Sequence, residues 1–207
     1  MVGGAPRLAV DAVRFLSVRA SGATARRLAE GLRATGVAVD LLLGSLAEPS
    51  LPALRYDSRS QLEAGLRAWI AAHPEGVVVM SAAINDYEVD EVVVEAGAST
   101  QHFAPGAKIP SGAEALVIRL KPASKVIDQL RGWGLRGPII GFKYEAADTV
   151  IAAAERLRVR TGAALVVANS LDGAVQALIG DSCQRFADRK ALIDALIDHV
   201  VGLATRG

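Results

Sequence analysis

Residues 77–89 read Val-Val-Val-Met-Ser-Ala-Ala-Ile-Asn-Asp-Tyr-Glu-Val, and the rest of the chain can be interpreted outward from them. Four apolar residues open the stretch, which is typical of a strand buried on both faces in a parallel sheet. The small residues 81–83 follow, and they leave room for a ligand to approach the backbone. Ligands of open α/β sheets bind just beyond the carboxyl ends of the strands. We therefore expect Asp86 to hold a polar group of a ligand, although an ordinary strand followed by an Asx turn would carry the same residues.

Length and composition predict a single domain spanning residues 1–207, with room for a sizeable insertion. Hydrophobic residues make up 51% of the chain and charged residues 22%, so a proper core can be buried. The formal net charge is only +1, which argues against a broad surface for nucleic acid.

Membrane and secretion signals are not expected in this chain. No apolar run reaches about 18 residues, and the first residues lack the basic and apolar regions of a signal peptide. Cys183 is the single cysteine, so neither an internal disulfide nor a cysteine-based metal site is expected. A reducing cytoplasm is the expected compartment.

The amino-terminal third predicts a glycine loop and then a helix. Residues 1–6 read as a loop, with no room for a strand before the glycine pair, and Arg14 falls on a loop or short strand. Apolar residues at helical spacing follow over 25–32, with Ser21 as the expected N-cap. Backbone N–H groups at such a helix start bind anions, so Ser21 and Gly22 could hold a phosphate. A serine cap also occurs where no ligand binds.

The remaining core pattern alternates strands and helices. Serine 58 or 60 is expected to cap the second helix. Strands are expected over 37–43, 54–56, 77–83, 138–144 and 162–169, with a hairpin over 174–187, and helices over 58–73, 124–130, 147–160 and 190–203.

Residues 88–120 interrupt this alternation. They are rich in turn-forming residues, and 116–120 alternate like a strand. Lys108 stands between turn formers, where a mobile loop could carry it to a phosphate, although exposed loop lysines are usually only solvated. The fold class we predict is α/β, a Rossmann-like doubly wound and mostly parallel sheet with a β-rich flap over 88–120.

Three expected strands end in polar residues, namely Asp86, Lys143 with Glu145, and Asn169. Parallel strands bring such ends to one edge of the sheet, beside the helix start at Ser21. Their convergence favours a ligand that carries phosphate.

Five blocks of the sequence resemble motifs of the phosphopantothenoylcysteine synthetase family, in the same order. The first block, Asp-Ala-Val-Arg-Phe-Leu-Ser at 11–17 with Ala-Ser-Gly at 20–22, resembles D-x-V-R-F-I-S-N-x-S-S-G. The second, Ser-Ala-Ala-Ile-Asn-Asp-Tyr at 81–87, resembles A-A-A-V-x-D-Y/F, and the third, Lys-Ile-Pro-Ser at 108–111, resembles the K-I flap. The last two, Gly-Phe-Lys-Tyr-Glu at 141–145 and Leu-Val-Val-Ala-Asn at 165–169, resemble G-F-x-x-E and L-I-V-A-N. The match is closer to the stand-alone, eukaryotic-type synthetases than to the bacterial fusions with a flavin decarboxylase.

The resemblance implies a two-step ligation of 4′-phosphopantothenate to cysteine, with ATP or CTP and Mg²⁺ required and no flavin. The carboxylate attacks the α-phosphate to give an acyl-nucleotidylate and pyrophosphate, and the cysteine amine then displaces the nucleoside monophosphate. A homodimer is implied, because the pantothenoyl arm binds across a dimer interface. By motif, the catalytic residues would be Arg14 and Lys108, the substrate-binding residues Ala82, Ala83 and Asp86, and the nucleotide-binding residues Ser21, Gly22, Phe142, Lys143 and Asn169.

The chain departs from the family pattern at the start of the first helix. Val18 stands where the family has an asparagine that bonds the acyl intermediate, and Ala23 and Ala25 replace residues of a glycine- and cation-bearing turn. Two other interpretations therefore stay open: a degenerate paralogue that binds a nucleotide or pantothenate derivative without ligating it, and a doubly wound domain with no such ligand.

Overall fold

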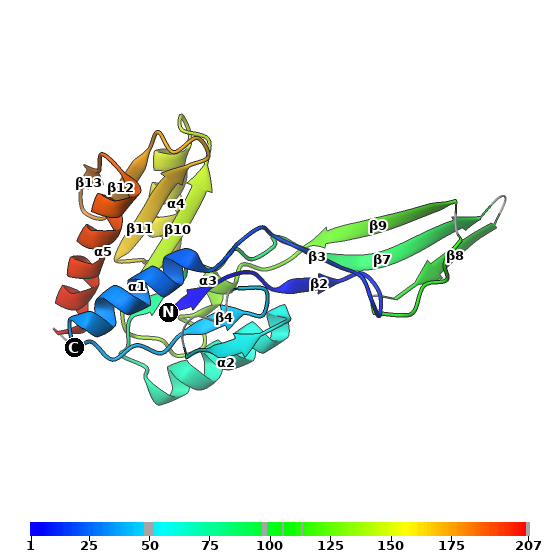
Figure 1. Ribbon diagram of the computed structural model, residues 1–207, viewed down its shortest axis with the longest axis horizontal. Coiled ribbons are helices and arrows are strands. Elements are labelled where there is room, and N and C mark those ends of the chain that lie inside the picture. Colours follow the sequence, from blue (N-terminus) through cyan, green and yellow to red (C-terminus); the bar gives the residue numbers. More distant parts are fainter. Residues whose placement is uncertain (48–51, 97–98, 105, 113, 206–207) are drawn as a thin grey trace.

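The structure is a computed structural model that describes residues 1–47, 52–96, 99–104, 106–112 and 114–205. It consists of an α/β core from which a β-rich arm extends to one side (Figure 1). The predicted fold class is confirmed, and so is the β-rich insertion.

The core sheet is made of two parts that meet between β1 and β6. One part has the order β5-β4-β1 and the other β6-β10-β11-β12-β13. A parallel bridge from Val2 to Met80 joins them, supported by hydrogen bonds from Ser81 N to Val2 O (3.0 Å) and from Ala83 N to Gly4 O (2.9 Å). The pairings up to β11 are parallel, whereas β12 and β13 are antiparallel. The strands are β1 Val2–Gly3, β4 Leu42–Gly44, β5 Leu54–Tyr56, β6 Val78–Val79, β10 Ile139–Glu145, β11 Leu165–Ser170, β12 Gln176–Ile179 and β13 Cys183–Arg185.

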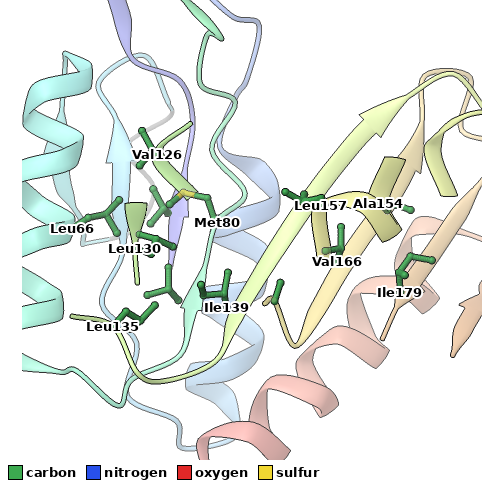
Figure 2. Close-up of a cluster of buried hydrophobic side chains, with 14 of the residues drawn as sticks. Leu66, Met80, Val126, Leu130, Leu135, Ile139, Ala154, Leu157, Val166 and Ile179 are labelled. Atoms are coloured by element: carbon green, nitrogen blue, oxygen red, sulfur yellow. The ribbon is translucent and has the colours of Figure 1, made fainter. Parts of the chain in front are cut away.

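Helices cover both faces of this sheet and bury separate apolar clusters. The helices α1 (Ala23–Ala34) and α5 (Arg189–Ala204) pack on one face. The helices α2 (Arg59–Ala72), α3 (Val126–Gln129) and α4 (Val150–Thr161) pack on the other. Figure 2 shows part of this second cluster, in which side chains such as Leu66, Leu130 and Leu157 meet those of the sheet. The apolar faces of these helices are therefore buried against the sheet, in a three-layer arrangement of helices, sheet and helices.

The arm joins two segments that are far apart in the sequence. The strands β7 (Tyr87–Ala96), β8 (Ser99–Phe103) and β9 (Ala115–Pro122) form an antiparallel sheet. The hairpin of β2 (Arg7–Ala9) and β3 (Phe15–Ser17) packs against it through a small apolar cluster. The hairpin is thus inserted between β1 and α1, where a doubly wound fold commonly has a short glycine turn.

Four expectations for the core were wrong in detail. Residues 1–6 are not all loop, because Val2–Gly3 form the buried strand β1. In place of the strands expected over 37–43 and 77–83, the structure has the shorter β4 (Leu42–Gly44) and β6 (Val78–Val79), which pair with their neighbours only over these residues. The helix expected over 124–130 is reduced to the four residues of α3.

The start of α2 agrees with its local signal, whereas the start of α1 does not. Ser58 caps α2 and forms a capping box with Gln61, as one of the two expected serines. Ser21 is not the N-cap of α1, however. Gly22 takes that position with φ of 72°, and the Ser21 hydroxyl instead accepts a hydrogen bond from Ala23 N at 3.3 Å. No helix in the described part of the chain has the length and apolar character needed to cross a membrane.

Candidate functional site

A cleft of about 310 Å³ opens at the carboxyl ends of β6 and β10. Its walls come from the segment after β6, the end of β10, the turn that begins α3, and one face of α4. The predicted residues that line it are Ala82, Ala83, Asp86, Phe142 and Lys143. The structure therefore brings together residues that the resemblance divided between the substrate and the nucleotide.

Small side chains form one wall of the cleft, and hydrogen bonds to the segment that contains β1 hold the backbone of this wall in place. Ser81 and Ala83 donate their N–H groups to Val2 O and Gly4 O, and the Ser81 hydroxyl donates to Val2 O at 2.8 Å. The segment after β6 is thereby held against the neighbouring strand. A ligand in the cleft meets methyl groups at Ala82 and Ala83 and can come close to the main chain.

Four basic side chains line the same cleft. Lys125 pairs with Asp86 at 2.8 Å, Lys143 with Glu145 at 2.6 Å, and Arg160 with Asp128 at 3.2 Å. Arg156 has no ion pair within the part of the chain that the structure describes. Such a concentration of cations beside small residues fits a polyanion such as a nucleotide phosphate chain.

The sequence interpretation missed Lys125, Arg156 and Arg160 as site residues. Arg156 and Arg160 are four residues apart on α4, so they lie on one face of the helix, next to the buried Leu157. That spacing was visible in the sequence, but it is equally typical of a solvated helix face. Only the packing of α4 beside β10 places the pair at the sheet edge.

The expected phosphate-binding start of α1 does not line this cleft, but it lies close to it. A Cβ atom added at Gly22 would lie 3.5 Å from Gly4 N, and Gly4 O accepts a hydrogen bond from Ala83 N in the cleft wall. Ser21 and Gly22 do not line it, and the start of α1 packs closely on the ends of β1 and β4. A Cβ atom added at Gly22 would lie 3.0 Å from the Ala47 Cβ atom.

Asn169 does not line the cleft either. It lies on β11 at 6% exposure, opposite Tyr144 of β10 and on the same face as Leu165 and Val167, which pack against α1 and α5. Its Oδ1 atom has no hydrogen-bond partner among the described residues. Of the predicted nucleotide-binding residues, Phe142 and Lys143 therefore line the cleft, whereas Ser21, Gly22 and Asn169 do not.

Arg14 is positioned on the arm by Asp11. The turn between β2 and β3 directs two N–H groups, those of Val13 (2.9 Å) and Arg14 (2.5 Å), at Asp11 Oδ1, and Arg14 Nε donates to Asp11 Oδ2 at 2.7 Å. Burial favours a higher pKa for Asp11, but these hydrogen bonds and the Arg14 guanidinium lower its pKa below the ordinary value. The carboxylate therefore stays charged and holds Arg14 in place.

Lys108 lies in the same part of the arm as Arg14. It is exposed on the loop between β8 and β9, next to Ala107, whose carbonyl accepts a hydrogen bond from Ala12 N at 3.3 Å. Arg14 and residues 109–112 also line one cavity of about 530 Å³. The structure brings the two predicted catalytic side chains to one arm, and neither lines the cleft of the same copy.

Comparison with known proteins agrees with this architecture. The family model of the DNA/pantothenate metabolism flavoprotein C-terminal domain matches residues 1–186. The chain belongs to this family. The coenzyme A biosynthesis bifunctional protein CoaBC of Thermococcus kodakarensis is 27% identical over 176 residues, which are 83% of this chain and 40% of the relative. The chain spans about two fifths of the length of the curated relatives it matches.

Solved structures of related proteins share the fold. The DNA/pantothenate metabolism flavoprotein of Streptococcus pneumoniae superposes with a TM-score of 0.80 at 21% identity, covering 97% of this chain and 96% of that chain. A Cab2 mutant in complex with phosphopantothenate-cysteine gives 0.77 at 16% identity, covering 99% and 85%. The match to the family model confirms the family resemblance deduced from the five motif blocks.

In this family member, a metal site made by protein side chains alone is not evident. The described residues contain no group of three or more histidine, cysteine, aspartate or glutamate side chains that could hold an ion. The cleft does offer two carboxylates, Asp86 and Glu145. Two carboxylates suit Mg²⁺, which usually takes one or two protein carboxylates together with phosphate oxygens and water.

Proposed function

We propose that this domain ligates 4′-phosphopantothenate to cysteine through an acyl-nucleotidylate, with ATP or CTP and Mg²⁺ as co-substrate and cofactor. The observation that carries the proposal is the cleft after β6, where small residues and four cations meet at the carboxyl ends of the parallel neighbours β6 and β10. Membership of the flavoprotein C-terminal domain family supports the same chemistry.

The proposed reaction needs charge stabilisation more than a protein nucleophile. Attack of the phosphopantothenate carboxylate on the α-phosphate forms an acyl-phosphate bond and breaks the bond to pyrophosphate. Negative charge grows on the phosphate oxygens in that step, and Lys125, Arg156 and Arg160 are placed to stabilise it. The amine of cysteine then forms the amide and displaces the nucleoside monophosphate.

Asp86 and the two alanines serve the pantothenoyl arm in this proposal. Ala82 and Ala83 allow the arm to lie along the main chain. Asp86 is about 60% exposed at its side chain, so it can accept a hydrogen bond from an amide or hydroxyl of the substrate.

We place Arg14 and Lys108 in the site of a second copy. Both lie on the arm, and the arm exposes an unusual number of large apolar side chains on β3, β7, β9 and the turn before β3. They are Val13, Phe15, Leu16, Val18, Tyr87, Val117 and Leu120. Exposed large apolar side chains gathered on one part of a molecule are typical of a protein interface. A homodimer that covers it would carry the arm of one subunit to the cleft of the other.

Product analysis tests the proposal directly. The purified protein is incubated with 4′-phosphopantothenate, cysteine, Mg²⁺ and either ATP or CTP, and pyrophosphate and products are measured by mass spectrometry. Pyrophosphate together with the amide, abolished in Arg156→Ala, is the expected result and identifies the nucleotide. Folded protein that forms neither product with either nucleotide would refute the ligase assignment.

A further inference from the structure

The turn that carries Lys125 into the cleft is held by a residue that does not line the cleft. Arg59, the first residue of α2, donates through Nη2 to Ser124 O and, at 3.0 Å, to Ser124 Oγ. Its Nε donates to Glu63 Oε1 at 2.8 Å, one turn along the same helix. One guanidinium therefore links α2 to the residue that precedes Lys125.

This turn joins the arm to the core. On one side β9 ends at Pro122, and the arm to which it belongs extends away from the core (Figure 1). On the other side α3 begins at the buried Val126, but no side chain caps its start. The turn also bonds to Asp86 O through Ala123 N at 2.8 Å, and Asp86 is followed directly by the arm strand β7. Arg59 therefore ties the turn to a core helix at a point that is independent of the arm.

The position of Arg59 does not favour the stability of α2. A cation at the first residue of a helix lies at the positive end of the macrodipole, and the first turn of α2 contains no acidic residue. The Nη1 atom of Arg59 is buried without a hydrogen-bond partner among the described residues, and an unpaired buried donor costs stability. Helix stability therefore does not explain an arginine at this position, whereas its contact with Ser124 does.

We infer that Arg59 is a positioning residue for the proposed ligation, and that it acts through Ser124 on Lys125. The inference rests on the proposed function, in which Lys125 stabilises the negative charge that grows on the phosphate oxygens. The Lys125 side chain is long and 39% exposed, so its place in the cleft depends on where the turn holds its backbone. A cation stabilises the transition state only at contact distance, and a small displacement weakens its effect.

A double-mutant cycle on the first step of the reaction tests this inference. Pyrophosphate release is measured by rapid quench without cysteine, at saturating 4′-phosphopantothenate, Mg²⁺ and either ATP or CTP. Lys125→Gln is expected to slow the step about 10²-fold, because a charge that stabilises the transition state is removed. Arg59→Gln is expected to slow it about tenfold, because the lysine is displaced but still present. The double variant is expected to react at the rate of Lys125→Gln alone, since the two residues act as one unit.

Arg67→Gln is the matched control. Arg67 lies on the same helix and also contacts a distant segment, with its Cζ atom 4.2 Å from the centroid of the Trp133 ring, outside the cleft. This variant is expected to react at the wild-type rate, and thermal melting shows whether each variant retains the fold. If Arg59→Gln does not fold, Glu63→Ala releases Arg59 at its other end. Glu63→Ala is expected to slow the step about threefold, and to have no effect in the Lys125→Gln background.

The outcomes separate the inference from the proposed function. If the losses multiply to about 10³-fold in the double variant, Arg59 acts independently of Lys125 and the inference is overturned. A wild-type rate in folded Arg59→Gln, or in folded Lys125→Gln, overturns it as well. The ligation itself stands in each of these cases. If folded wild type releases pyrophosphate with neither nucleotide, the proposed function fails and the inference fails with it.

Discussion

Asp11 shows how one buried carboxylate can position a side chain, here the predicted catalytic Arg14, on an otherwise exposed arm. Its side chain is fully buried, whereas that of Arg14 is 49% exposed, so the pair is anchored from the Asp11 side. The loop that carries Arg14 would sample many conformations without these three hydrogen bonds. Because the pKa of Asp11 is lowered, the charged form persists in the folded protein to unusually acid pH.

The Asp11→Asn variant is expected to lose stability in a way that depends on pH. An unfolded aspartate has a pKa of about 3.9. Because the folded pKa is lower, the stabilisation by the carboxylate is fully present above the unfolded value and disappears as pH falls through the folded value. Urea unfolding at pH 6 and in steps below pH 4 measures this effect. The difference between wild type and variant is expected to shrink in acid, and a constant difference would show that packing rather than charge is lost.

Val18 is the residue at which the chain departs most clearly from its family. It follows β3 on the arm and is 38% exposed, so its side chain is free to meet a ligand brought to the arm. Val18→Asn introduces the asparagine side chain that, by the resemblance, hydrogen-bonds the acyl intermediate. Amide formation is expected to rise by on the order of 10²-fold if that hydrogen bond acts in the transition state. Rapid-quench measurement of the second step decides this, and an unchanged rate would mean that the site is organised around valine.

The contact between β1 and α1 depends on the absence of a side chain at Gly3. A Cβ atom at this position would lie 2.3 Å from the Ala25 Cβ atom, which is fully buried on α1. The backbones of α1 and β1 therefore approach each other closely at this point. Ala25 is one of the departures from the family turn, and the structure uses it as a packing residue.

Gly3→Ala is expected to destabilise the fold by about 1–3 kcal/mol, because α1 must move away from the sheet. Gly202→Ala in α5 is the matched control. A Cβ atom there meets no heavy atom within 4 Å, and alanine in a helix interior is favoured over glycine by roughly 0.5–1 kcal/mol. Chemical denaturation of both variants should therefore give shifts of opposite sign. A neutral Gly3→Ala would show that α1 does not pack this closely.

Elements with local signals were predicted well. The capped helix α2, the amphipathic α4 and the strands β5, β10 and β11 follow from serine caps, apolar spacing and β-branched runs. The two-residue strand β1 has no comparable signal, because its pairing partners lie far away in the sequence. Residue 2 pairs with residues 42 and 80, and no local pattern contains that information.

At the scale of the whole molecule, the arm separates Arg14 and Lys108 from the cleft of the same copy. This separation makes the proposed dimer testable by complementation. Arg14→Ala disables the arm and Asp86→Ala disables the cleft, and each variant alone is expected to lose ligation. In a mixed dimer, one of the two sites combines an intact arm with an intact cleft.

Equal amounts of the two variants, unfolded and refolded together, are expected to regain about a quarter of wild-type activity. Half of the dimers are then mixed, and each mixed dimer has one intact site of two. Each variant refolded alone is the control, and thermal melting shows whether the fold is retained. A mixture no more active than the two variants refolded alone would contradict the shared site. Either the arm and the cleft of one site then belong to the same subunit, or Arg14 or Asp86 does not act in the site.

The fold class, the β-rich insertion and the family could all be deduced from the printed residues, because they depend on local periodicity, turn chemistry and short motifs. The strand-end residues Ala82, Asp86 and Lys143 were identified in the same way, since parallel strands present their carboxyl ends together. Only the tertiary structure showed which of the predicted residues line one cleft, and that Lys125, Arg156 and Arg160 line it with them. It also joined an amino-terminal hairpin to the distant flap. The lining of the cleft and the composition of the arm depend on which elements pack side by side. That packing is decided by the burial of apolar surface between segments far apart in the chain, and no local sequence pattern contains this information.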